Sequence, residues 1–193
     1  MAHYHYSWAL YLWDRMEEAI VEHKLAQKYD PFNPSQTAWL GGLYCYDGQY
    51  EEAIKCANEA LEIQKDYVVS YYILGETYLK MGKMDEAIEA HQKLAELMPF
   101  WSWQLGITYA AAGQFEEAEE ILDELEKTPV IPFTAHGRIV LNAALGRMDE
   151  AFKWLDYEPH HAWTAWVAVM PEAESLREDP RYQNFLKRLN LPD

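Results

Sequence analysis

The chain has 193 residues, of which 50% are hydrophobic, and it contains only 9 glycines and 9 prolines. This composition excludes a disordered or collagen-like chain. Aspartate and glutamate outnumber lysine and arginine by 32 to 16, and the resulting net charge of -16 disfavours binding to nucleic acid or to an anionic membrane surface.

An alanine recurs along the chain in the same sequence context. From the N-terminus the copies follow one another at intervals of 34, 34, 31 and 33 residues, at Ala19, Ala53, Ala87, Ala118 and Ala151. A glycine lies five positions before each of the last four alanines, at Gly48, Gly82, Gly113 and Gly146. Asp14 holds the same place in the first copy. Glycine readily adopts the left-handed conformation that ends a helix. Each copy is therefore predicted to be two helices joined by a short turn.

Residues 68–98 form the most regular copy. Apolar and small residues follow the i, i+3, i+4, i+7 spacing of an amphipathic helix, at Tyr71, Leu74, Gly75 and Tyr78. Counterparts of Gly75, each followed three residues later by a tyrosine, stand at Gly41 and Gly106. These small residues are expected to let two helices approach closely, while the tyrosines fill the space between copies.

The segments DGQYEEAIKCANEAL, MGKMDEAIEAHQKLA, AGQFEEAEEILDELE and LGRMDEAFKWLDYE resemble the turn and second helix of the tetratricopeptide repeat (TPR). The resemblance covers about residues 1–158. It implies an all-α, right-handed TPR superhelix, an α-solenoid, with C-terminal capping helices. We expect five repeats, at residues 1–33, 34–67, 68–98, 99–131 and 132–158, and capping helices over 159–193.

The copies depart from the consensus at three places. The first begins inside a helix, with no N-cap before His3, which we interpret as a cut or as a missing upstream repeat. The third is short and passes through Pro99 directly into the next helix. In the fifth, Ile139 and Asn142 replace the small residue and the tyrosine, so its packing against the fourth copy should differ.

The C-terminal stretch is predicted to cap the array. One helix is expected over 161–170, and a second is expected to begin at Asp179-Pro180. The second helix places four apolar residues on one face, Tyr182, Phe185, Leu186 and Leu189. The sequence LREDPRYQNFLKRLNLP resembles the C-terminal ends of bacterial multidomain signalling proteins. In that group a TPR array follows a winged-helix, nucleotide-cyclase or protein-kinase domain.

The TPR resemblance also implies a binding groove. Consensus positions 5, 9 and 12 of the first helices line the concave face of such an array. By register these positions hold Tyr4, Trp8, Tyr11, Ala38, Gly42, Cys45, Tyr72, Glu76, Leu79, Trp103, Ile107, Ala110, His136, Val140 and Ala143. From this set the predicted groove residues are Tyr4, Trp8, Tyr11, Tyr72, Glu76, Leu79, Trp103, Ile107 and His136. None is a lysine or arginine, which departs from the TPR proteins that clamp a terminal carboxylate. A groove rich in aromatic residues is suited to an apolar helix or an extended peptide, although these aromatics could instead pack only against neighbouring repeats.

The sequence therefore predicts a non-enzymatic protein-protein interaction scaffold that binds a protein or peptide within a signalling or regulatory protein. The alternative is self-association into a homodimer through an exposed end repeat carrying Tyr4, Tyr6, Trp8 and Trp13. A third alternative, an enzyme with its site at the shortened junction, would need a substrate or metal that no motif predicts.

Polar residues that could suggest chemistry are better explained by the repeat. The paired acidic residues that precede each repeated alanine fall in the first turn of a helix, where negative charge is favourable. His23 and His91 occupy one packing position in two copies, so we expect core packing rather than metal binding. No cofactor is expected. Cys45 and Cys56 form no CxxC motif, so we expect reduced thiols. The sequence shows no signal peptide and no run of about 18 apolar residues that could span a membrane. We therefore expect a cytoplasmic protein.

Overall fold

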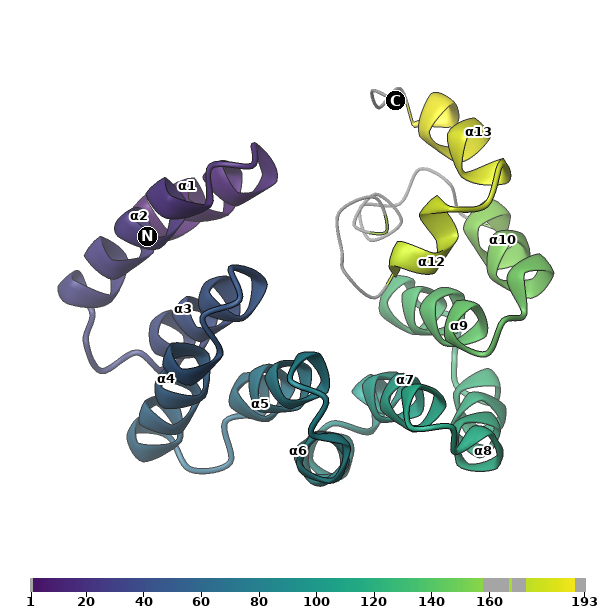
Figure 1. Ribbon diagram of the computed structural model, residues 1–193, viewed down its shortest axis with the longest axis horizontal. Helices are drawn as coiled ribbons and strands as arrows, with labels where there is room; N and C mark the ends of the chain where they lie inside the picture. The colour runs from purple at the N-terminus through teal and green to yellow at the C-terminus, as the bar shows by residue number, and fades with distance from the viewer. Residues whose placement is uncertain (1, 158–166, 168–172, 190–193) are drawn as a thin grey trace. The chain divides into compact units, whose positions relative to one another are not determined.

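The computed structural model describes residues 2–157, 167 and 173–189, and every regular element in these ranges is helical (Figure 1). The first six helices are α1 (Ala2–Leu12), α2 (Met16–Tyr29), α3 (Pro34–Tyr46), α4 (Tyr50–Ile63), α5 (Val68–Lys80) and α6 (Met84–Leu97). A 3-10 turn, η1 (Pro99–Trp101), precedes α7 (Trp103–Ala111), α8 (Phe115–Glu126), α9 (Pro132–Ala144) and α10 (Met148–Tyr157). The last described helices are α12 (Glu174–Arg177) and α13 (Arg181–Arg188).

Consecutive helices pack as antiparallel hairpins, from α1 with α2 to α9 with α10. The first helix of a hairpin also contacts the second helix of the hairpin before it, as α3 contacts α2 and α5 contacts α4. The chain divides into two compact units, residues 1–97 and residues 98–193. The division falls at the shortened spacing between the third and fourth copies. We call residues 1–97 unit 1 and residues 98–193 unit 2.

The turns within the hairpins adopt the predicted backbone conformation. Gly48, Gly82, Gly113 and Gly146 have φ angles between 73° and 78°, and Asp14 has φ 58° at the same place in the first hairpin. The residue after each of these turn residues donates its backbone N–H to the carbonyl oxygen of the residue five positions earlier. Lys83, for example, donates to Tyr78 over 2.9 Å. This bond satisfies one of the carbonyls left open at the end of a helix. The predicted left-handed turns are confirmed.

The repeated alanines and small residues lie where helices meet. All five alanines of the repeat column are fully buried. A Cβ atom added to Gly75 would lie 2.2 Å from the His91 ring, and one added to Gly41 would lie 3.0 Å from the Ala53 carbonyl oxygen. Only glycine leaves room for these contacts, so the predicted close approach of helices is confirmed.

In the last full hairpin an arginine takes the place of the leucine found in earlier copies. Arg138 occupies the position of Leu105 and is almost completely buried. Its Nη2 atom donates to the carbonyl oxygens of Leu125 (2.7 Å) and Thr128 (2.8 Å) at the end of α8. Its guanidinium also lies 4.7 Å from the centre of the Trp154 ring. Arg138 therefore caps α8 from the neighbouring hairpin.

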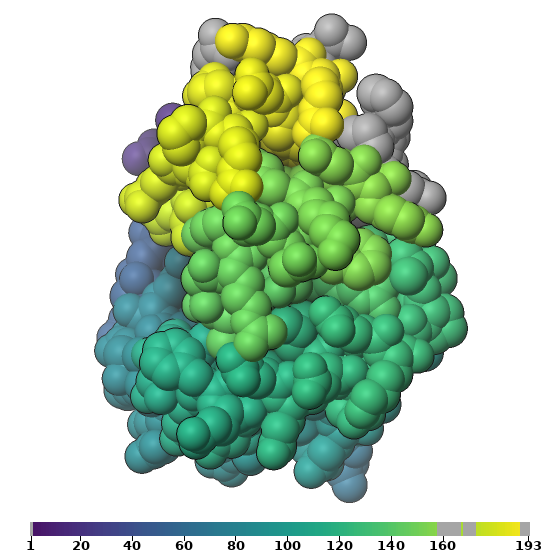
Figure 2. Space-filling model, turned by 90° about the vertical axis from the view of Figure 1, so that its right-hand side faces the viewer, coloured from purple at the N-terminus to yellow at the C-terminus, as the bar shows by residue number. Residues whose placement is uncertain are grey.

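The C-terminal helices cover the end of unit 2, as Figure 2 shows on the side where residues 173–189 lie against α9 and α10. Phe185 and Leu176 are fully buried, and Tyr182 and Leu186 are nearly so. Arg181 of α13 pairs with Asp149 of α10 (2.7 Å), and Arg188 pairs with Asp156. The predicted apolar face of the last helix is confirmed as a cap. The helix expected over 161–170 lies outside the described residues, except for Val167.

Candidate functional site

The first helices of unit 1 carry a continuous set of aromatic side chains, which we call the aromatic cluster. It comprises Tyr4, Trp8 and Tyr11 of α1, Trp39 and Tyr46 of α3, and Tyr72 of α5. The residues of α1 are spaced four and three apart, and those of α3 seven apart, so on each helix they share one face. Three hairpins therefore contribute to one surface feature.

The rings contact one another from α1 to α5. Trp8 meets Tyr11 and Trp39 edge to face, with ring centres 5.7 Å and 5.3 Å apart. Tyr11 stacks on Tyr46 at 5.4 Å, and Trp39 lies 5.9 Å from Tyr72. The Tyr46 and Tyr72 hydroxyl groups form a hydrogen bond of 3.0 Å. Edge-to-face and offset contacts of this kind each add about 0.5–1.5 kcal/mol beyond area burial, so the cluster is held in a defined arrangement.

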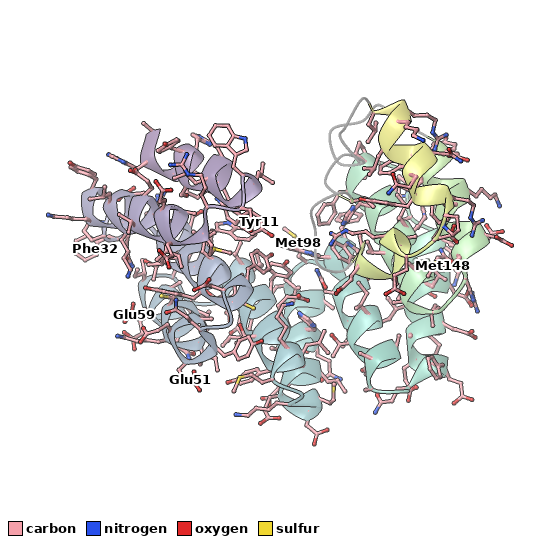
Figure 3. The ribbon with its side chains drawn as sticks, turned by 45° about the horizontal axis from the view of Figure 1, so that its top comes forward. Tyr11, Phe32, Glu51, Glu59, Met98 and Met148 are labelled. Carbon is pink, nitrogen blue, oxygen red and sulfur yellow. The ribbon has the colours of Figure 1, made fainter. Side chains whose placement is uncertain are left out.

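The cluster is anchored at one end and accessible elsewhere. Tyr72 is only 1% exposed. Trp8, Tyr11, Trp39 and Tyr46 are half-buried, so each still presents part of its ring to solvent. In Figure 3 Tyr11 and the exposed Phe32 lie near opposite ends of the α1–α2 hairpin. A rigid and partly exposed aromatic surface can accept apolar side chains with little loss of side-chain entropy.

Two members of the cluster, Trp39 and Tyr46, were not among the predicted groove residues. The repeat register selects Ala38, Gly42 and Cys45 on α3 instead, and all three are buried. A Cβ atom on Gly42 would lie 3.2 Å from the Trp39 ring, which therefore occupies the space above the glycine. The sequence signal for this arrangement was Gly42, because a residue without a side chain leaves room for the ring of Trp39 on the same helix.

The remaining predicted groove residues lie in different surroundings. In unit 1 Glu76 is buried and Leu79 is half-buried. In unit 2 Ile107 is half-buried, whereas Trp103 and His136 are buried and their rings meet edge to face at 5.3 Å. A Cβ atom on Gly137 would lie 2.4 Å from the Trp103 ring. Trp103 and His136 therefore take part in the packing of unit 2.

Three buried histidines are held in the neutral form. Burial lowers the pKa of His23, His91 and His136 to about 4. His23 accepts or donates hydrogen bonds at both ring nitrogens, to the Ser7 hydroxyl (2.9 Å) and the Gln36 carbonyl oxygen (3.0 Å). Its ring also supports the aromatic cluster from below, 5.4 Å from Tyr4. The predicted packing role of His23 and His91 is confirmed.

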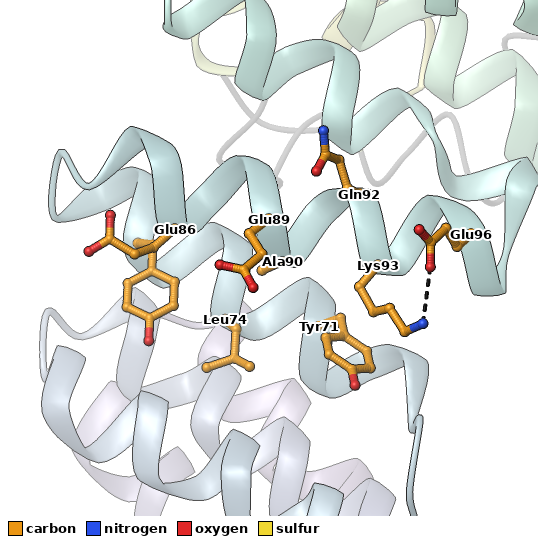
Figure 4. A pocket seen from close by; sticks show the side chains of 9 residues that line it. Tyr71, Leu74, Glu86, Glu89, Ala90, Gln92, Lys93 and Glu96 are labelled. Carbon is orange, nitrogen blue, oxygen red and sulfur yellow. Dashed lines mark hydrogen bonds and ion pairs between the residues drawn. The ribbon is translucent and has the colours of Figure 1, made fainter.

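A second candidate is an open pocket of about 580 Å³ between α5 and α6, shown in Figure 4. Tyr71, Leu74 and Tyr78 of α5 line it together with charged residues of α6. Lys93 pairs with Glu96 across 3.0 Å, and Glu86 and Glu89 add further carboxylates. These charged groups are near solvent, so the pocket presents a hydrated, mainly acidic rim rather than a dry binding site.

The candidates for chemical reactivity among the described residues include two buried free cysteines, Cys45 and Cys56. Burial raises the pKa of the Cys45 thiol to about 11 and that of the Cys56 thiol to about 12, which disfavours the reactive thiolate. Within the described ranges, no three histidine, cysteine or acidic side chains gather in a way that could hold a metal ion. None of the described helices is both long and apolar enough to cross a membrane.

The fold and this surface define a helical repeat protein whose first helices present an aromatic face. Two family models described as tetratricopeptide repeat match residues 35–99 and 74–132, and together they span just over half of the chain. The chain belongs to the tetratricopeptide repeat family, whose members are generally non-catalytic scaffolds for protein interactions. The resemblance inferred from the repeated motifs is confirmed.

Curated relatives match over short regions. A TPR repeat-containing protein of Methanocaldococcus jannaschii is 41% identical over 51 residues, which is 26% of this chain and 15% of that protein. The TPR repeat-containing protein YpiA of Bacillus subtilis is 28% identical over 107 residues, which is 54% of this chain and 25% of YpiA. The chain thus spans a quarter or less of the length of these relatives.

Solved structures match over most of the chain. A thermophilic TPR protein of Thermus thermophilus superposes with a TM-score of 0.68 at 21% identity, covering 91% of this chain and 98% of that one. PilF of Pseudomonas aeruginosa gives a TM-score of 0.55 at 18% identity, covering 91% and 80%. At these identities the likeness concerns the fold alone, and it confirms the all-α TPR solenoid.

Proposed function

We propose that the protein is a non-enzymatic scaffold that binds a segment of a partner protein on the aromatic cluster of unit 1. The observation that carries the proposal is the contact chain from Trp8 through Trp39 to the buried Tyr72, in which the rings order one another while those of Trp8 and Trp39 stay partly exposed. Tyrosine and tryptophan are the residues most often found at the centre of protein interfaces. A helix or extended peptide with apolar anchors is the segment that such a surface fits.

The charge of the chain adds a preference to this proposal. With a net charge of -16, the chain attracts basic segments and repels acidic ones over about 8 Å in physiological salt. The partner segment is therefore an apolar or aromatic peptide flanked by lysine or arginine. Its binding should weaken as salt rises, because the flanking contacts are screened while the apolar contacts remain.

The test begins with peptides selected from a displayed random library against the whole chain. Affinities are then measured by fluorescence polarisation for the wild type, Tyr11→Ala and Tyr46→Ala, with Phe115→Ala as the control. Phe115 is an exposed aromatic residue at the start of α8, outside the cluster. Loss of a central aromatic contact should weaken binding about tenfold or more.

Two readouts separate binding from folding. Circular dichroism should show unchanged helicity for all three variants, because the substituted side chains are not fully buried. Tyr72 and Trp103 are unsuitable for this test, since both are only 1% exposed and their truncation would destabilise the core. If Tyr11→Ala and Tyr46→Ala bind the selected peptides as tightly as the wild type does, the cluster serves packing alone and the proposal fails.

The C-terminal resemblance extends the proposal to the cellular role. The stretch from Leu176 to Pro192 resembles the ends of multidomain signalling proteins, which supports a place for this array in a cytoplasmic regulatory protein. Sequencing the coding region that flanks the chain would test this role. A winged-helix, cyclase or kinase domain there would support it, and an unrelated or absent neighbouring domain would contradict it.

A further inference from the structure

The outer face of α2 differs from the same face of every following second helix up to α8. Four positions with heptad spacing point away from the hairpin, and in α2 they hold Glu18, Val21, Leu25 and Lys28. In α4, α6 and α8 all four positions are charged. Their residues are Glu52, Lys55, Glu59 and Glu62, then Glu86, Glu89, Lys93 and Glu96, and finally Glu117, Glu120, Glu124 and Lys127. The chain thus carries apolar side chains on α2 where α4, α6 and α8 carry charged ones.

This difference leaves an apolar strip open to solvent. Val21 is 57% exposed, and Tyr29 at the end of α2 is 75% exposed. Tyr6 of α1 is 45% exposed, whereas its counterpart Leu40 in the next hairpin is 3% exposed because the preceding hairpin covers it. Leu25, which lies between Val21 and Tyr29 in the sequence, is half-buried. A strip that combines Val21, Leu25, Tyr29 and Tyr6 has the composition of a helix interface rather than of a solvated face.

The charges at the two ends of the strip indicate what covers it. Glu18 stands one heptad position before the apolar pair and Lys28 stands one after it. The Glu18 carboxylate accepts hydrogen bonds from the Arg15 guanidinium at the start of α2 (2.6 and 2.7 Å) and remains largely exposed, so it can also meet a second cation. If two copies of α2 pack antiparallel about a two-fold axis, Val21 of one copy meets Leu25 of the other, and Glu18 of each meets Lys28 of its partner. The same charges would clash in a parallel pair, because Glu18 would face Glu18. The strip is therefore complementary to itself.

We propose that this strip, made of Glu18, Val21, Leu25, Lys28, Tyr29 and Tyr6, is the interface of a two-fold homodimer in which the α2 helices pack antiparallel. The contact is small, and the net charge of -16 on each copy opposes association. The dimer is accordingly weak and strengthens with salt, in contrast to the salt-weakened peptide binding of the aromatic cluster. This site is independent of the aromatic cluster, so either proposal can fail alone.

The first test measures mass against concentration by sedimentation for the whole chain. Between about 1 µM and about 1 mM, a range in which a weak dimer dissociates, the weight-average mass should rise from 22.6 kDa toward twice that value. The matched variant is Val21→Lys with Leu25→Glu, which gives α2 the residues that α4 carries at Lys55 and Glu59. These residues are compatible with the helix, and the variant should raise the dissociation constant at least tenfold.

A charge-swap series tests the antiparallel register. Glu18→Lys and Lys28→Glu should each weaken the dimer about tenfold, and the double variant should return to within about threefold of the wild type. Glu18→Lys lowers the magnitude of the net charge, so general repulsion predicts a stronger dimer and the register predicts a weaker one. A chain that remains monomeric up to about 1 mM would overturn the proposal, as would full association of the Val21→Lys, Leu25→Glu variant or failure of the double swap to restore it.

Discussion

The stability of unit 1 should fall as the pH decreases from 7 to 5, because buried histidines must be neutral in the folded chain. His91 is fully buried beside Gly75, and burial lowers its pKa from 6.5 to about 4. At a pH between these two pKa values, the histidine is protonated in the unfolded chain and neutral in the folded chain. The free energy of unfolding therefore decreases as the pH falls through this window, and the contribution of His91 is fully present only above its unfolded pKa.

The magnitude follows from the size of the pKa difference. One pKa unit corresponds to about 1.4 kcal/mol, so lowering the pH from 7 to 5 costs about 2 kcal/mol for one such histidine. His23 has the same shift to about 4 and adds to the effect in the same unit. Most carboxylates remain ionised down to about pH 5, so the histidines dominate this window.

The variant His91→Leu isolates the effect. Leu122 and Leu155 fill the equivalent position in the fourth and fifth copies and are fully buried there, so leucine fits this site in the repeat. Urea unfolding followed by circular dichroism at pH 7, 6 and 5 should show about 2 kcal/mol less loss of unfolding free energy in the variant. His5→Ala, which removes a histidine at an exposed position, serves as the control. If His91→Leu loses as much stability as the wild type between pH 7 and 5, the reasoning is refuted.

Three further substitutions test the packing by urea unfolding. Asp14→Gly should stabilise the chain by about 0.5–1 kcal/mol, because Asp14 has φ 58° in a turn where the other copies use glycine; lower stability would contradict this account. Gly75→Ala should destabilise it by about 1–3 kcal/mol, since the new methyl group would lie 2.2 Å from the His91 ring; a neutral effect would show that the ring can move away. Arg138→Leu should cost about 2–3 kcal/mol, because the last carbonyls of α8 lose a charged donor; unchanged stability would mean that water replaces Arg138 there.

The hairpins and their turns could be predicted because one physical requirement recurs at a fixed interval. Each hairpin must bring its helices close together and must reverse the chain in few residues. The buried alanine column and the left-handed residues at Gly48 and Asp14 follow from these two needs. They depend on local geometry, which the spacing of the residues in the sequence reports directly.

The aromatic cluster could be predicted only in part. The register identified Tyr11 and Tyr72, whose helix positions face the same side, but it treats each position as independent of its neighbours. Trp39 joins the cluster because Gly42 leaves space beside it on the same helix. Such a side-chain displacement depends on the size of another residue, and a list of consensus positions does not contain it.

Arg138 is a second residue whose role the repeat pattern does not predict. The leucine column of Leu40, Leu74 and Leu105 predicts an apolar residue at this position. The buried guanidinium instead reaches three carbonyl groups around the end of α8. The departure was visible in the sequence, but its partner lies in the preceding helix. Only the packing of α9 against α8 shows which carbonyl groups the Nη2 atom of this buried side chain meets.

The two proposed surfaces of unit 1 can be occupied at the same time, because the aromatic cluster packs against the inner side of α2 and the proposed dimer interface lies on its outer side. His23 faces inward and contacts Tyr4 and Ser7 of α1. Val21 and Leu25 each lie two residues from His23, about 200° around a helix with 3.6 residues per turn, and therefore face outward. A dimer formed through the outer strip leaves the inner aromatic side uncovered, and each dimer would present two aromatic clusters. A partner with two suitable segments would then bind more tightly than the single-site affinity predicts, through effective concentration alone.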